Sequence, residues 1–133
     1  MWPFRRRQRP APAGTLRLGE PSADPADYGV YTVSESRFPD AFTAVWSRAT
    51  DDEQAAGVLR RWATLVPVHD PKYGVADLAV EFDGLRACYL RPPHLGRMAA
   101  HIDRENVAAL EVPALVERGP AGPMVTLLIA DEE

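Results

Sequence analysis

A short central stretch of the chain, ADLAVEFDGLRACY at Ala76–Tyr89, decides the fold. Large apolar residues alternate with small or charged ones up to Phe82, and this two-residue period is typical of a β-strand with one buried face. Asp83-Gly84 follows and favours a two-residue hairpin turn. The turn predicts a register with apolar pairs on one face and an ion pair on the other: Phe82 with Leu85, Glu81 with Arg86, Val80 with Ala87, and Leu78 with Tyr89.

Before the hairpin, β-favouring residues predict strands at 30–33 and 64–68. Two helices are expected between these strands. The first begins at Pro39, and its apolar face follows helical spacing through Phe42, Val45, Trp46 and Ala49. The second begins at Thr50, which matches the capping-box pattern with Glu53. The buried face expected for this second helix is Ala55, Val58, Leu59 and Trp62.

After the hairpin, Pro92-Pro93 opens a further helix, and strands are expected at 110–116 and 125–130. Pro113 predicts that the first of these strands lies at a sheet edge or carries a bulge. Short connections favour antiparallel pairing. The sequence therefore predicts a mainly β protein with helices (α+β), a partly open antiparallel β-barrel of about six strands with two to three short helices.

Charge divides the chain into two parts. Residues 1–27 are rich in Pro and Arg with a net charge of +2, and we expect them to form a flexible basic arm. Residues 28–133 carry a net charge of −6 and form the predicted domain, so tight non-specific binding to duplex DNA is not expected. The apolar runs are too short for a membrane span or a signal peptide, and one cysteine forms no internal disulfide, so the expected location is cytoplasmic.

Catalytic and metal-binding signatures are weak. The three histidines, His69, His94 and His101, and the single thiol of Cys88 have no zinc-ligand spacing, so neither a metal nor another cofactor is expected. Asp70 beside His69 could form an acid–base couple, although an Asp-Pro turn explains it equally simply. We therefore expect a binding protein and not an enzyme.

Aromatic and basic residues gather in the predicted surface loops. The candidates for nucleic-acid binding are Arg37, Phe38, Lys72, Tyr73, Tyr89 and Arg91. Aromatic rings near Arg or Lys can stack single-stranded bases and hold phosphates. The structural alternative is that Phe38 staples a helix, Tyr73 packs its loop and Tyr89 lies in the core with its hydroxyl at the rim.

Three stretches together resemble the HIRAN domain family: YTVSESRFPDAF at 31–42, LVPVHDPKYGVADLAV at 65–80 and FDGLRACYL at 82–90. The resemblance implies a stand-alone, bacterial-type member over 28–133, with an OB-like fold and a link to DNA repair. It implies binding of single-stranded DNA or DNA 3′ ends in a pocket lined by Arg37, Phe38, Tyr73 and Tyr89. Phe38 and Tyr73 would stack bases, and Arg37 would hold phosphate.

Several residues depart from that family pattern, among them Ser34 in place of Gly and Ala87-Cys88 in place of Val-Gly. Gly74 stands where the family signature has an Asp, and Asp77 stands where it has a small residue. An acid expected to contact a DNA end is therefore absent from its usual place. The alternative function is a protein-interaction module that keeps the barrel and has lost recognition of DNA ends.

Overall fold

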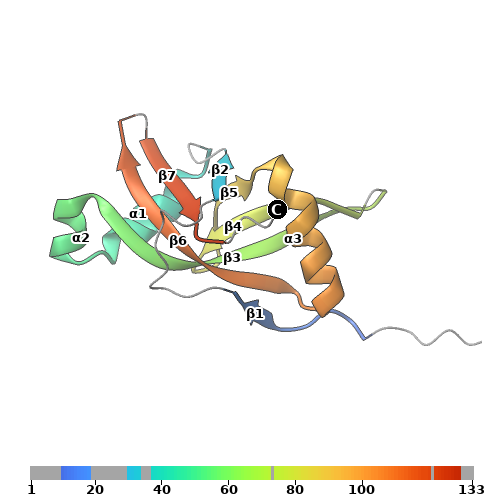
Figure 1. Ribbon diagram of the computed structural model, residues 1–133. Helices are drawn as coiled ribbons and strands as arrows, with labels where there is room; N and C mark the ends of the chain where they lie inside the picture. The colour runs from blue at the N-terminus through green and yellow to red at the C-terminus, as the bar shows by residue number, and fades with distance from the viewer. Residues whose placement is uncertain (1–9, 19–29, 34–36, 73, 121, 130–133) are drawn as a thin grey trace, which may run out of the picture.

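The structure is a computed structural model that describes residues 10–18, 30–33, 37–72, 74–120 and 122–129. Ten elements follow one another within these described residues (Figure 1): β1 (Thr15–Arg17), β2 (Val30–Val33), α1 (Pro39–Ser47), α2 (Asp51–Ala56), β3 (Val58–Asp70), β4 (Gly74–Phe82), β5 (Leu85–Leu90), α3 (Pro92–Glu105), β6 (Ala109–Gly119) and β7 (Gly122–Leu127). None of these helices is long and apolar enough to cross a lipid bilayer.

The strands form one mixed sheet in the order β1-β6-β3-β4-β5-β2-β7, and β7 also pairs with β6. All pairings are antiparallel except that of β1, which lies parallel to β6. β2 joins β5 and β7 through only two residue pairs on each side, so the sheet is not fully closed there. The prediction of a mainly β protein with helices is confirmed.

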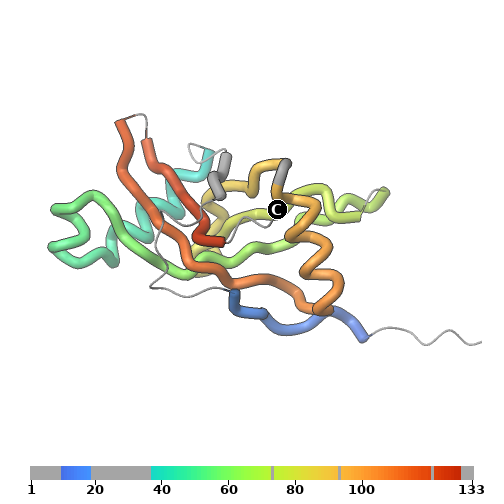
Figure 2. Tube along the Cα trace, viewed as in Figure 1, coloured from blue at the N-terminus to red at the C-terminus, as the bar shows by residue number. Residues whose placement is uncertain are grey.

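One apolar core fills the space between the sheet and the helices. The strands β3, β4 and β6 contribute core residues at alternate positions, and α1 and α3 add apolar residues. Figure 2 traces the path of these elements. The largest fully buried side chains are Leu59, Leu65, Leu78, Leu90, Leu110, Leu127, Leu128, Val80, Val112, Val116 and Val125. Burial of each of these side chains stabilises the fold by about 1.5–3 kcal/mol relative to leaving it in water. The core therefore supports the surface residues described below.

The second helix begins as predicted but ends sooner. Thr50 accepts from the Glu53 backbone N–H at 3.2 Å and Glu53 accepts from the Thr50 N–H at 3.0 Å, which completes the capping box. The predicted buried face of this helix is wrong, because Gly57 adopts a left-handed conformation with φ of 71° and ends it. Val58, Leu59 and Trp62 therefore belong to β3, whose first residues pair with β6.

The β4–β5 hairpin contains a bulge that the sequence did not reveal. The pairs Phe82–Leu85 and Glu81–Arg86 are confirmed, but Val80 faces Cys88 and Ala79 faces Tyr89. The predicted pairs Val80–Ala87 and Leu78–Tyr89 are wrong, because Ala87 is an additional residue in β5. Ala87 and Cys88 are both small enough to be buried in succession, and Tyr89 leaves the core.

The prediction that Pro113 lies at a sheet edge or carries a bulge is wrong, because Pro113 faces Trp62 within the unshifted β3–β6 register. β6 pairs with β3 throughout its middle and on its other side with β1 up to Glu111 and with β7 from Ala114. Pro113 falls between these two partners, and its carbonyl accepts from the Leu128 N–H at 2.8 Å. Proline has no backbone N–H, and the position of this absent donor coincides with the place where β6 changes partner. Its absence therefore costs the sheet no hydrogen bond.

The predicted flexible arm over 1–27 is wrong at residues 15–17, which form β1. Ala108 N–H donates to the Gly14 carbonyl at 2.9 Å and Leu18 N–H donates to the Glu111 carbonyl at 2.7 Å. Leu16 packs against the core. The edge of β6 orders this short strand by supplying its hydrogen bonds. Residues 1–9 and 19–27 lie outside the described part of the chain.

Candidate nucleic-acid interface

Two aromatic rings and two guanidinium groups alternate where the start of α1 meets β5. The ring centroids of Phe38 and Tyr89 are 5.7 Å apart in an edge-to-face arrangement, with an interplanar angle of 67°. The Arg37 guanidinium carbon is 5.9 Å from the Phe38 centroid, and that of Arg86 is 5.6 Å from the Tyr89 centroid. These distances are within the range of cation–π attraction. We call these four residues the Phe38–Tyr89 cluster.

The local backbone explains how the cluster forms. Phe38 is the N-cap residue of α1, and the following Pro39 favours the first helical turn. The bulge at Ala87 puts Arg86 and Tyr89 on the same face of β5, although residues three apart in a regular strand point to opposite faces. Arg86 Nη1 consequently donates to the Tyr89 hydroxyl at 3.2 Å.

The cluster is electropositive. Within the described part of the chain, neither Arg37 nor Arg86 forms an ion pair. Arg86 faces Glu81 across the β4–β5 pair, but the predicted ion pair between them is wrong, since Arg86 turns to Tyr89. The half-buried rings of Phe38 and Tyr89 thus lie beside two cations that no described carboxylate neutralises.

Four of the six predicted site residues lie at or near this place. Arg37, Phe38 and Tyr89 are in the cluster, and Arg91 is an exposed residue two positions after Tyr89, at the start of α3. Tyr89 is partly buried and is not among the fully buried core residues, and its hydroxyl accepts from Arg86. Sequence reasoning missed Arg86 because its position depends on the bulge.

The loop between β3 and β4 lies apart from the cluster. Lys72 is exposed in this loop, and Tyr73 lies outside the described residues. Gly74 begins β4 five residues before Ala79, which faces Tyr89. At about 3.4 Å per residue this is roughly 17 Å, so Lys72 does not join the cluster.

A second group of arginines lies around Trp62 of β3. The Arg17 guanidinium carbon lies 4.2 Å from the Trp62 ring centroid, and Arg17 Nε donates to Glu111 at 2.9 Å. Arg48 pairs with Asp83 at 2.8 Å. These guanidinium groups resemble those of the Phe38–Tyr89 cluster, but each already has a carboxylate partner.

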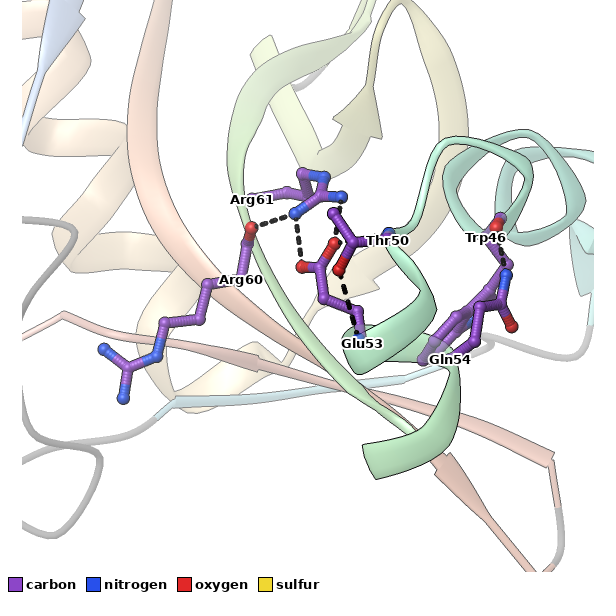
Figure 3. Close-up of polar contacts among 6 residues, drawn as sticks. All are labelled: Trp46, Thr50, Glu53, Gln54, Arg60 and Arg61. Atoms are coloured by element: carbon purple, nitrogen blue, oxygen red, sulfur yellow. Dashed lines mark hydrogen bonds and ion pairs between the residues drawn. The ribbon is translucent and has the colours of Figure 1, made fainter.

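Arg61 belongs to the same ion-paired group (Figure 3). It binds both carboxylate oxygens of Glu53, at 2.8 and 2.9 Å, and donates to the Arg60 carbonyl at 2.7 Å. The Arg61 hydrogen bonds and the Thr50 N–H bond lower the pKa of Glu53 from 4.5 to about 2. The ion pair also raises the pKa of Arg61. These contacts tie α2 to β3.

A groove of about 490 Å³ lies between α1 and the β6–β7 hairpin. Its lining includes Pro39, Thr43 and Trp46 from α1 and Arg118 from β6. The Arg118 guanidinium carbon lies 4.0 Å from the Trp46 ring centroid, and Arg118 Nη2 donates to the Gln54 side-chain oxygen at 2.6 Å. This groove begins at Pro39, the residue next to Phe38.

Among the described residues no three His, Cys, Asp or Glu side chains lie together as a metal site would require. Cys88 is buried in the core. Comparison with known proteins identifies no matching family model, no matching curated protein and no matching solved structure.

Proposed function

We propose that this protein is a non-catalytic module that binds single-stranded nucleic acid through the Phe38–Tyr89 cluster. The observation that carries the proposal is the alternation of two partly exposed rings with two guanidinium groups that no described carboxylate neutralises. The resemblance to HIRAN domains and their OB-like fold supports single-stranded DNA, and DNA 3′ ends, as the ligand class.

The proposed division of labour follows from the chemistry of each group. A base stacked on an aromatic ring contributes about 1–3 kcal/mol and needs no particular base identity. Phe38 and Tyr89 would provide those surfaces, and Arg37 and Arg86 would contact the phosphates on either side. Arg91 is close enough in the chain to Tyr89 to contact a further phosphate.

The overall charge of the chain leads to a second expectation, which concerns the affinity for duplex and single-stranded DNA. The net charge is −4, so duplex DNA receives little long-range attraction, and binding depends on the local cluster. We expect modest affinity for single strands, a clear decrease with added salt, and weaker binding of a blunt duplex.

The test is fluorescence anisotropy with three labelled ligands at two salt concentrations. A single strand with a free 3′-hydroxyl should bind better than the same strand with a 3′-phosphate, and both should bind better than a blunt duplex. Equal binding of the two strands would restrict the proposal to single strands without end recognition. No binding of any strand at low salt would contradict it.

A protein-interaction module is the second candidate function, and the groove beside α1 favours it. The walls of the groove are largely apolar and lie beside the exposed Met124. This candidate predicts no salt-dependent binding of nucleic acid and a defined protein partner whose binding is lost when Trp46 or Arg118 is replaced.

A further inference from the structure

We infer that the groove between α1 and the β6–β7 hairpin continues the nucleic-acid path, and that Arg118 contacts a phosphate of the strand whose bases stack on Phe38 and Tyr89. This inference rests on the proposed function. It adds a second contact point, a path for the bound strand and a minimum length for full affinity.

Continuity of the surface is the first argument. Phe38 immediately precedes Pro39, which lines the start of the groove, and Trp46 lies further along the same helix. Eight residues of helix separate Phe38 from Trp46, a distance of about 12 Å at 1.5 Å per residue. This length corresponds to roughly three to four phosphates of a stacked strand at 3.4 Å spacing, and to fewer phosphates of an extended one.

The state of the Arg118 charge is the second argument. Its side-chain acceptor is the neutral amide oxygen of Gln54, whereas Arg17, Arg48 and Arg61 each bind a carboxylate. Within the described residues the positive charge of Arg118 is therefore not neutralised. A phosphate is a suitable partner, since charge-assisted hydrogen bonds to guanidinium are the strong ones.

Positioning is the third argument. Gln54 Nε2 donates to the Trp46 carbonyl at 2.6 Å (Figure 3), and the Gln54 oxygen holds Arg118 over the Trp46 ring. Arg118 is therefore held in place before any ligand arrives, which lowers the entropy lost on binding. Few flexible surface arginines have this support.

The shape of the groove is the fourth argument. A volume of about 490 Å³ lies within the range of sites that bind small organic groups such as a nucleoside. Phe42, Pro39 and Pro123 give apolar walls, and Gly122 adds no side chain at the hairpin end. A base and its sugar fit against such walls while the phosphate points to Arg118.

The experiment compares a short and a longer ligand, dT2 and dT8, by following backbone amide NMR shifts of the full chain. dT8 reaches Arg118 from the Phe38–Tyr89 cluster, and dT2 does not in a stacked conformation. We expect Arg118→Gln to weaken dT8 binding about tenfold and to lower its salt slope by about 0.7, with dT2 binding unchanged. Arg118→Lys, which keeps the charge, should recover part of the loss.

Arg17→Gln is the matched control, because Arg17 also covers a tryptophan but is ion-paired. It should leave dT8 binding unchanged. An equal loss for Arg17→Gln, an equal loss of dT2 affinity in Arg118→Gln, or an unchanged dT8 affinity in Arg118→Gln would overturn the inference and leave the proposed function standing. Failure of the parent protein to bind both dT2 and dT8 would overturn the proposed function itself.

Discussion

Neighbouring residues of α2 hold two arginines in opposite ways. Glu53 binds Arg61 through both carboxylate oxygens, and Gln54 binds Arg118 through a neutral amide oxygen. The same contrast separates the region around Trp62, where Arg17 and Arg48 are ion-paired, from the Phe38–Tyr89 cluster. We refer to the first kind as neutralised arginines and to the second as available arginines.

The comparison teaches that a cation–aromatic contact does not define a binding site by itself. Arg17 lies closer to its ring than Arg86 lies to Tyr89, at 4.2 Å against 5.6 Å. Arg17 nevertheless has its charge satisfied by Glu111, and its contacts secure β1 against β6 and β3. On the proposed function, an arginine paired with a carboxylate makes a structural contact, and an arginine without such a partner can bind a phosphate.

The largest expected effect is on the two rings of the Phe38–Tyr89 cluster. Phe38→Ala and Tyr89→Ala should each weaken binding of single-stranded DNA by about 1–3 kcal/mol, roughly 5- to 150-fold, because each removes a stacking surface. Anisotropy titrations measure the change, and circular dichroism checks that the fold is kept. Unchanged affinity in both variants would remove the cluster from the interface.

The next largest expected effect is a loss of stability when the capping box of α2 is broken. α2 has no buried residue, so its position depends on its cap and on the Glu53–Arg61 contact. Thr50→Ala should lower the free energy of unfolding by about 1 kcal/mol in urea denaturation, and Thr50→Ser should restore it. If Ser and Ala behave alike at this position, the hydroxyl bond to the Glu53 N–H is not what holds the helix.

A single substitution should turn an available arginine into a neutralised one. Gln54→Glu places a carboxylate beside Arg118, which should reduce dT8 affinity about fivefold. It also removes the Nε2 hydrogen bond to the Trp46 carbonyl, so the free energy of unfolding should fall by about 0.5–1.5 kcal/mol. The matched control is Glu53→Gln, which removes the carboxylate of the neutralised Arg61, keeps an amide oxygen for the Thr50 N–H and does not touch Arg118. A Gln54→Glu variant with parental dT8 affinity would break the distinction between the two kinds of arginine at this helix.

The smallest expected effect is on the pH dependence of the free energy of unfolding. The pKa of Glu53 is lowered from 4.5 to about 2 in the folded protein, first by the Arg61 hydrogen bond. A carboxyl group with a lowered pKa stabilises the fold above its unfolded pKa and loses that contribution as the pH falls from about 4.5 to about 2. Thermal melts over this range should show a shallower pH dependence in Glu53→Gln, which keeps a capping acceptor but cannot titrate.

Local patterns in the sequence predicted the elements that depend on neighbouring residues. The hairpin turn at Asp83-Gly84 and the Thr50–Glu53 capping box are confirmed. The start of β3 was missed because Val58, Leu59 and Trp62 fit a helical face and a strand equally well, and only pairing with β6 decides between them. β1 was missed because β6 supplies its hydrogen bonds.

The candidate site was predicted in part for the same reason. Arg37, Phe38 and Tyr89 are visible from residue type and from their place beside predicted strands. Arg86 joins them only through the bulge at Ala87, which depends on how two small residues pack in the core. The groove and Arg118 were missed because β6 and α1 are far apart in the sequence and meet only in the fold.

The most direct test of the distinction between available and neutralised arginines is the salt dependence of dT8 binding in two double variants. Arg37→Ala/Arg86→Ala removes two available arginines, and Arg17→Ala/Arg48→Ala removes two neutralised ones, with the same change in net charge. The account predicts that the slope of log K against log salt falls in magnitude by about 1.4 in the first variant and is unchanged in the second. Equal slopes in the two double variants would contradict it.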